Sequence, residues 1–490
     1  MQTVHLRITD GRTGKPTPVR ISVRDLQGHS FAPLGRMTEF STASGEDLGG
    51  HVWHEGRPWY YIDGTCEIRL PIGSLELDAR KGPEYLPLKK TIHLAAGQLS
   101  LRESISPWIS DTNPGWYSGD LRVHDMSPHA ALLEGAGENL DMVQILCRTS
   151  AGRQGKTSRI SNMLAFSGTE ACLSNCHCQV VVNTMNQHHF LGTVGLLDCH
   201  RPVFPLDFGG EGGYEDWSVV DWCDQCHRKR GVVTWPDLPR LSQDHPQGEA
   251  LAAAILGKMD VFEITQLSGF DDEKIARYYD LLNCGIRMGL GGASGKESNQ
   301  TLMGSHRTYA YLEGELTPER WAQSVRAGKT LIGNGPHLRF EVGEKGPGSN
   351  LVLERGGRIT ARAMASLPGL MDRVEILEKG KVVATGRACE EDGTASVEVE
   401  LECQSGTWLA ARCLEKRPRP NEALLFAHSS PVWIEVPSRP LLAGPEASRR
   451  FIQLLDQTQT WVLQKARCER EKDREHLLNH LREASTHLEK

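Results

Sequence analysis

The residues best suited to chemistry begin in the stretch GWYSGDLRVHD, residues 115–125. In a β-strand the side chains of Arg122 and His124 would point to the same face, because side chains alternate with a period of two residues. Histidines at both positions would make a metal-binding pair, but here a guanidinium, which cannot ligate a metal, holds the first position. The stretch therefore leaves three alternatives: a metal site that has been dismantled, one that has been rebuilt from other residues, or a site that was never present.

Two further histidines, His188 and His189, follow an apolar run that predicts a strand. One of them could rebuild a metal site together with His124 and His129. Because adjacent residues on a strand face opposite ways, at most one of the pair should take part. The alternative interpretation is that these are ordinary polar residues of a loop.

Three arginines, Arg122, Arg287 and Arg307, are expected near the ends of predicted strands. If they converge, they would form an anion pocket, since arginine binds carboxylate or phosphate groups through two parallel hydrogen bonds. The alternative is that each arginine pairs with a local carboxylate.

The thirteen cysteines are scattered along the chain, which is typical of reduced thiols rather than of a disulfide framework. The stretch CDQCH, residues 223–227, matches a haem-attachment pattern, but two cysteines packed on a helix are the favoured interpretation. The stretch CLSNCHC, residues 172–178, could form a weak metal clip with Cys199 and His200. Thiols in a loop facing solvent are the favoured interpretation there.

The elements that must position these residues fall into four segments. Short alternating runs with Gly, Asp and Pro between them predict a β-sandwich over residues 1–110. Alternating helical and apolar strand patterns over 111–335 predict a parallel sheet or barrel covered by helices. Strand patterns return over 336–438 and predict a second β-sandwich, with EKGK (378–381) as a hairpin turn.

Residues 439–490 read as a linker followed by an amphipathic helical tail. Its apolar positions include Phe451, Leu455, Val462, Leu478 and Leu481. Such a tail is expected to dock on its own protein, or on a protein partner or a second copy of the chain.

The composition excludes several classes of function. With 39% hydrophobic and 24% charged residues, the chain is typical of an ordinary globular protein. A formal net charge of -7 offers no electrostatic case for nucleic acid, which would need a clustered basic face. There is no apolar run near the ~20 residues of a membrane span, and the first residues do not resemble a secretory signal. We therefore expect a cytoplasmic protein that binds neither nucleic acid nor membrane.

Four motifs in order resemble the CehA/McbA-type metallohydrolases of the PHP (polymerase and histidinol phosphatase) superfamily. They are GWYSGDLRVH, DWCDQCHRKRGVVTWP, YYDLLNCGIRMGLGGASG and GSHRTYAYL, which together span residues 115–312. The resemblance implies a distorted (β/α)7 barrel with metal ions bound at the C-terminal ends of its strands. It also implies hydrolysis of phosphoesters or of carboxyl and carbamate esters by metal-activated water.

At the positions where the family holds its metal ligands, most residues of this chain cannot coordinate a metal ion. The expected ligands fall on Arg122, on Cys147, Arg148 and Thr149, near Thr184, and on Ser294, Gly295 and Lys296. His124 matches the family, and Asp237 stands where a histidine is usual. One histidine and one aspartate do not make a tight transition-metal site.

We therefore predict a multidomain α/β plus β protein whose PHP-like barrel is flanked by two β-sandwiches and a helical tail. It is expected to have lost its metal centre, to need no cofactor, and to act as a binding or scaffold protein. A small anionic ligand would sit near Arg122, His124, Asp237, Arg287 and Arg307.

The alternative is an active metal-dependent hydrolase with an atypical ligand set. It would hold Zn, Mn or Fe with His124, Asp237 and either His188 or His189. A third possibility is a Cys-rich metal or redox module.

Overall fold

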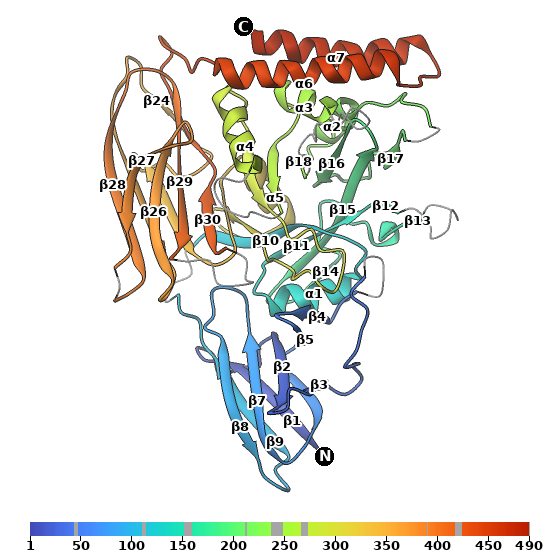
Figure 1. Ribbon diagram of the computed structural model, residues 1–490, viewed down its shortest axis with the longest axis vertical. Helices are drawn as coiled ribbons and strands as arrows, with labels where there is room; N and C mark the ends of the chain where they lie inside the picture. Colours follow the sequence, from blue (N-terminus) through green and yellow to red (C-terminus); the bar gives the residue numbers. More distant parts are fainter. Residues whose placement is uncertain are drawn as a thin grey trace.

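The structure is a computed structural model. It describes residues 1–43, 48–109, 114–150, 159–210, 213–236, 248–265, 273–389, 391–416 and 424–489. The described chain is mixed α/β and mostly strand, with several sheets and a pair of long helices at the C-terminal end. Figure 1 shows the N-terminal strands at one end of the molecule and the two long helices at the other.

The N-terminal region consists of two β-sheets that share one core (Figure 1). The first sheet has the order β6 (Thr65–Leu70), β1 (Gln2–Asp10), β9 (Ser100–Ile105). The second has the order β4 (His51–His54), β5 (Arg57–Ile62), β2 (Val19–Asp25), β7 (Gly73–Arg80), β8 (Leu88–Leu94), with β3 (Ser30–Phe31) beside β2. Along β1, Val4, Leu6 and Ile8 are buried and alternate with more exposed residues, as expected for a strand with one face in a core.

The central region contains the strands that carry most of the candidate site residues. Its longer strands are β10 (Trp116–Val123), β11 (Met142–Cys147), β15 (Gln179–His188), β16 (Gly192–Leu197), β18 (Val232–Trp235), β19 (Val261–Ile264), β20 (Gly289–Gly292), β21 (Arg307–Tyr311) and β22 (Thr330–Gly333). The short ones are β12 (Thr149–Ser150), β13 (Arg159–Ile160), β14 (Leu173–Ser174) and β17 (Asp207–Phe208). Its helices are α1 (Pro128–Gly137), α2 (Val219–Arg228), α3 (Gly248–Ile255), α4 (Glu273–Asn283) and α5 (Pro318–Arg326).

The strand directions in this region are only partly parallel. Strands β10, β11 and β15 pair in parallel, as do β18, β19 and β20. By contrast, β16 runs antiparallel to both β15 and β18, and β21 runs antiparallel to β10 and β22. The parallel pairs bring the C-terminal ends of β10, β11 and β15 to the same edge, where His124 follows β10 and Arg148 follows β11.

Buried polar contacts join the N-terminal region to α1. Arg20 Nε lies 2.8 Å from Glu138 Oε1, and the Tyr61 hydroxyl donates to the same carboxylate oxygen at 2.8 Å. Lys81 Nζ donates to the carbonyl oxygens of Pro18 (3.1 Å) and Ala136 (2.8 Å). These bonds fix the end of α1 against β2, and α1 in turn packs on β11 and β15.

The sheet of the central region continues into the C-terminal strands. Strand β22 pairs with β30 (Phe426–Ser429), so hydrogen bonding crosses the boundary predicted at 335–336. The same sheet includes β24 (Asn350–Val352), β26 (Met371–Glu378), β27 (Lys381–Arg387), β29 (Thr407–Glu415) and β31 (Val432–Glu435). A separate sheet has the order β23 (His337–Val342), β25 (Gly357–Ser366), β28 (Thr394–Cys403). The predicted EKGK turn is confirmed, because Glu378 pairs with Lys381 across the β26–β27 hairpin.

The tail forms two long helices, α6 (Pro445–Gln464) and α7 (Glu471–Glu489), which lie side by side over the central region (Figure 1). They pack on α3 and α4, and Leu455, Val462, Leu478 and Leu481 join the same buried cluster as Trp222 and Leu251. The expectation that the tail docks on its own protein is therefore confirmed.

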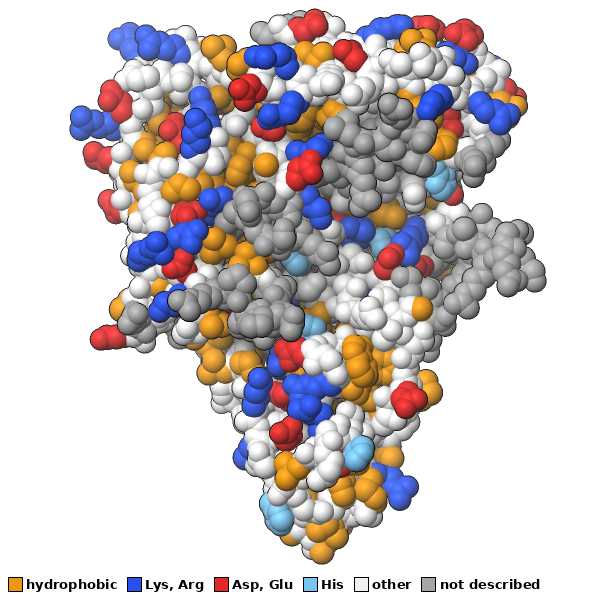
Figure 2. All heavy atoms as spheres, viewed as in Figure 1, with side chains coloured by type: hydrophobic (Ala, Val, Ile, Leu, Met, Phe, Trp, Pro, Cys, Tyr) orange, Lys and Arg blue, Asp and Glu red, His pale blue; other side chains and the backbone are white. Residues whose placement is uncertain are grey.

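On the face shown in Figure 2, Lys and Arg side chains are interspersed with Asp and Glu rather than gathered in one basic patch. Among the helices in the described residues, none is long and apolar enough to cross a membrane.

Candidate functional site

The site begins with His124, which follows β10 and is completely buried. Its Nδ1 lies 3.1 Å from the carbonyl oxygen of Leu146 in β11, so this nitrogen carries the proton and donates it. Its Nε2 is buried and has no hydrogen-bond partner within the described part of the chain. Burial, together with the positive charges of Arg122 and Arg148, holds the pKa of His124 well below its usual value. The residue is therefore a neutral imidazole with a buried acceptor that has no donor among the described residues.

Arg122 forms an ion pair with a carboxylate from another strand. Its Nε lies 2.6 Å from Oε1 of Glu263 in β19, and the Glu263 side chain is completely buried. The backbone N–H of Arg122 donates to Asp120 Oδ1 at 3.2 Å, and that carboxylate also accepts from the N–H groups of Ser294 and Gly304. Burial raises the pKa of Asp120, and the backbone donors oppose this. Arg122 is thus held between β10 and β19 rather than extended into solvent.

Arg148 supplies a second guanidinium whose positive charge acts on His124. Its two terminal nitrogens lie 2.6 Å from Asp125 Oδ2 and 2.8 Å from Glu297 Oε2. Its Nε is buried and has no hydrogen-bond partner among the described residues. The ends of β10, β11 and β19 therefore present two guanidiniums and a neutral imidazole, with their carboxylates already engaged in ion pairs.

Lys296, at another position where the resemblance places a ligand, is part of the interior. Its side chain is completely buried, and Nζ donates to the carbonyl oxygens of Thr301 (2.7 Å) and Ser298 (3.3 Å). Nζ also lies 3.5 Å from Oε2 of the equally buried Glu134 in α1. The Lys296 carbonyl accepts from the backbone N–H of His124 at 2.8 Å, so the backbone of Lys296 helps to hold His124 in place.

His188 and His189 form a separate cluster in which each meets a carboxylate. His188 Nε2 lies 3.2 Å from Glu215 Oε2, and His189 Nε2 lies 2.8 Å from Asp207 Oδ1. Burial lowers the pKa of His188 to about 3 and raises the pKa of Glu215 to about 7, whereas the bond to Asp207 raises the pKa of His189. No described contact joins either histidine to His124. Asp237 lies outside the described residues.

The other two predicted arginines, Arg287 and Arg307, contact different parts of the described chain. Arg287 is half-exposed, pairs with Glu435 at 2.7 Å and lies over the Trp433 ring. Arg307 is buried, donates to the carbonyl oxygens of Gly304 and Glu138 (both 3.0 Å) and lies 3.6 Å from Glu84. Each of the three arginines thus meets a carboxylate of its own, and no described contact brings the three together in one anion pocket.

Sequence reasoning identified Arg122 and His124 but treated Arg148 only as a lost ligand. A signal for Arg148 existed, because it directly follows the apolar run MVQILC, which forms β11. The carboxylates Glu263, Asp125 and Glu297 were missed. Two of them come from segments more than 100 residues away from their arginines, so no local pattern indicates them.

The cysteine motifs are divided between core and surface. Cys223 and Cys226 are completely buried on α2, in agreement with helix packing, whereas Cys176 is exposed and Cys178 is buried. Among the described residues, no three His, Cys, Asp or Glu side chains are grouped so that they could hold a metal ion.

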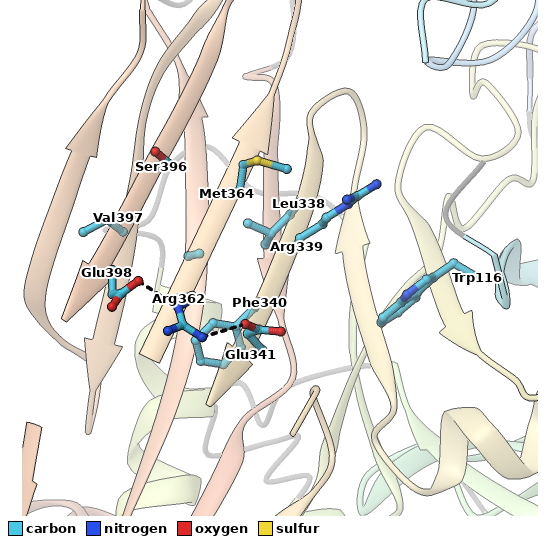
Figure 3. Close-up of a pocket in the computed structure, with 11 residues that line it drawn as sticks. Trp116, Leu338, Arg339, Phe340, Glu341, Arg362, Met364, Ser396, Val397 and Glu398 are labelled. Atoms are coloured by element: carbon cyan, nitrogen blue, oxygen red, sulfur yellow. Dashed lines mark hydrogen bonds and ion pairs between the residues drawn. The ribbon is translucent and has the colours of Figure 1, made fainter. Parts of the chain in front are cut away.

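A cavity of about 560 Å³ lies elsewhere, over the sheet of β23, β25 and β28, with Trp116 on its opposite side (Figure 3). Arg362 Nε lies 2.7 Å from Glu398 Oε2, and its terminal nitrogen lies 3.4 Å from Glu341 Oε1. All three side chains are about half-exposed, so these pairs are screened by water and add little binding energy. The strand ends near His124 remain the stronger candidate site.

Comparisons with known proteins do not identify a family for this chain. No family model matches the chain, and no curated protein matches it. Among solved structures, an engineered protein is 11% identical, with 36% of this chain and 40% of that chain covered and a TM-score of 0.14. The β-glucuronidase of Parabacteroides merdae, with glycerol in its active site, is 8% identical, with 86% and 60% covered and a TM-score of 0.17. The chain thus spans less than two thirds of these structures, and such TM-scores carry no argument about fold or function.

Proposed function

We propose that the protein is a PHP-type hydrolase homologue in which a metal-independent binding site has replaced the metal centre, and that its ligand is a small anion. In this proposal the central region is a distorted (β/α)7 barrel flanked by two β-sandwich domains. The parallel strands β10–β11–β15 and β18–β19–β20, the helices between strands, and the paired sheets of the N-terminal region support that architecture.

The observation that carries the proposal is that Arg122 and Arg148 both act on His124, because the positive charge of each lowers its pKa. A divalent cation about 4 Å from one guanidinium would be repelled by about 8 kcal/mol at an effective dielectric constant of 20. An anion in the same place is attracted instead, and guanidinium groups donate to its oxygens in pairs. The guanidinium charges taken by themselves therefore favour an anion over a metal ion, whereas the paired carboxylates of Glu263, Asp125 and Glu297 offset those charges.

The imidazole adds a preference among anions. With Nδ1 donating to Leu146, the open Nε2 of His124 can only accept a hydrogen bond in its neutral form. An anion that carries its own hydroxyl, such as hydrogen phosphate, can donate to Nε2 while its other oxygens accept from Arg148. Sulfate has no such hydroxyl at neutral pH. The ligand class that fits is thus a protonated oxyanion, for which inorganic phosphate is the simplest probe.

We expect inorganic phosphate to bind the full-length chain several-fold more tightly than sulfate, and Arg148→Gln to weaken phosphate binding at least tenfold. A tenfold loss corresponds to about 1.4 kcal/mol, a modest value for one charge-assisted hydrogen bond. Isothermal titration calorimetry would measure both affinities. Arg287→Gln is the matched control, because Arg287 also pairs with a glutamate but lies away from His124, and it should leave binding unchanged.

The competing function, an active metal-dependent hydrolase, is separated by metal analysis of protein purified without chelator. About one equivalent of zinc, manganese or iron that is lost in His124→Ala would overturn the proposal. Equal affinity for phosphate in the wild type and in Arg148→Gln would also contradict it.

A further inference from the structure

Two buried thiols from distant segments meet at the opposite end of the parallel strands from His124. Cys199 Sγ and Cys226 Sγ lie 3.4 Å apart, and both side chains are almost completely inaccessible. Cys199 follows the end of β16, and Cys226 lies in the last turn of α2, just before β18 begins. A disulfide bond is about 2.05 Å long, so the two sulfur atoms need to approach by little more than 1 Å.

The surroundings hold the two sulfur atoms together. A Cβ placed on Gly231 would lie 2.5 Å from Cys199 Sγ and 2.6 Å from Cys226 Sγ, so the bare backbone at this glycine closes one side of the pair. Any side chain there would force the sulfur atoms to move. Cys223 lies one turn earlier on the same helix and is equally buried, but no contact in the described part of the chain joins it to Cys199. The geometry therefore singles out one pair from three neighbouring thiols.

We propose that Cys199 and Cys226 form a reversible disulfide when the protein is exposed to a peroxide. Hydrogen peroxide oxidises one thiol to a sulfenic acid and releases one water molecule. The second sulfur attacks the sulfenic sulfur, and the hydroxyl leaves with the proton of the second thiol as another water molecule. In total, two thiols and one hydrogen peroxide give one disulfide and two water molecules, and a dithiol reductant reverses the change.

Burial sets the rate and the effect of this reaction. Because burial raises the pKa of the Cys226 thiol well above its usual value, little thiolate forms, and oxidation should be slower than at the exposed Cys176. Once formed, the bond would link positions 27 residues apart and reduce the freedom of the unfolded chain. We expect the thermal midpoint to rise by about 5 °C. Phosphate binding should not change, because the pair lies at the far end of the strands.

To test this, reduced full-length protein is treated with hydrogen peroxide and its remaining thiols are alkylated. Its peptides are then mapped without reduction. We expect a Cys199–Cys226 linked peptide that is lighter by two hydrogen atoms and separates again on reduction. The rise in thermal midpoint should be absent in Cys199→Ser and present in Cys223→Ser, the matched control. If Cys199→Ser does not fold, Cys226→Ser should likewise lack the rise in thermal midpoint. The peptide map is made on the wild-type protein and does not depend on either variant.

Three results would overturn this inference. They are a linkage that involves Cys223, sulfinic or sulfonic acid at Cys199 or Cys226 without a linkage, and no linked peptide after the exposed cysteines have been fully oxidised. The outcome is independent of the proposed anion site, because neither thiol takes part in that site.

Discussion

Lys296→Met should lower the free energy of unfolding by about 3–5 kcal/mol, the usual cost of removing one partner of a buried ion pair. Lys296 and Glu134 are both completely inaccessible, with Nζ 3.5 Å from the carboxylate. Burial already raises the pKa of Glu134, and Lys296 opposes that rise. Without the ammonium group, the carboxylate would remain in a low-dielectric site, where the Gly50 N–H is its one hydrogen-bond donor among the described residues. Urea unfolding monitored by circular dichroism would measure the loss.

The double variant Lys296→Met with Glu134→Gln separates charge from packing. It should recover much of the lost stability, because a neutral amide can still accept from Gly50 and no buried charge is left alone. Lys90→Met is a matched control, since Lys90 also pairs with a glutamate but is half-exposed, and it should cost less than about 1 kcal/mol. An equal loss in the single and double variants would refute the electrostatic explanation.

The second large effect is the dependence of stability on the protonation of His428. This residue in β30 is completely buried between Tyr279, whose hydroxyl oxygen lies 2.7 Å from Nε2, and the carbonyl oxygen of Ser429, 2.7 Å from Nδ1. Burial lowers its pKa to about 3. As the pH falls below about 6.5, protons bind the unfolded chain first, so the stability contributed by neutral His428 is lost as the pH falls toward 3.

The contribution of neutral His428 to the free energy of unfolding should fall by about 2 kcal/mol between about pH 7.5 and about pH 5. Asp141, Asp198 and Glu215 have pKa values raised by burial and act in the opposite direction, so the total slope does not isolate His428. The measurement is therefore the difference in unfolding free energy between wild type and His428→Gln at the two pH values. That difference should shrink by about 2 kcal/mol at the lower pH.

Local patterns in the sequence predicted several elements correctly. The EKGK turn between β26 and β27, the alternating strands of residues 1–110 and the amphipathic tail are all present. Each of these depends on the chemistry of neighbouring residues, such as a glycine in a turn or a stripe of leucines on a helix. Strand direction was harder to predict. The run LGTVGLL forms β16 as a fully buried strand, and an apolar run of this kind reads the same in either direction.

The candidate site was predictable only in part for a similar reason. His124 and Arg122 could be selected from the spacing of one strand. The ion pair from Arg122 to Glu263 spans 141 residues, and that from Arg148 to Glu297 spans 149. The choice of carboxylate for each arginine depends on which strand ends meet, and this is a property of the assembled sheet. The same holds for Cys199 and Cys226, whose separate motifs gave no sign of their contact.

The position of α6 and α7 has a consequence for synthesis on the ribosome. Side chains of α2, α3 and α4 in the central region are buried in one cluster with those of the two tail helices, including Leu455 and Leu478. Until both tail helices have left the exit tunnel, the apolar surface of α3 and α4 that they cover stays open to water. The N-terminal sheets, which have their own core, can close early, whereas the middle of the chain must wait for the tail and is a natural client for chaperones during that interval.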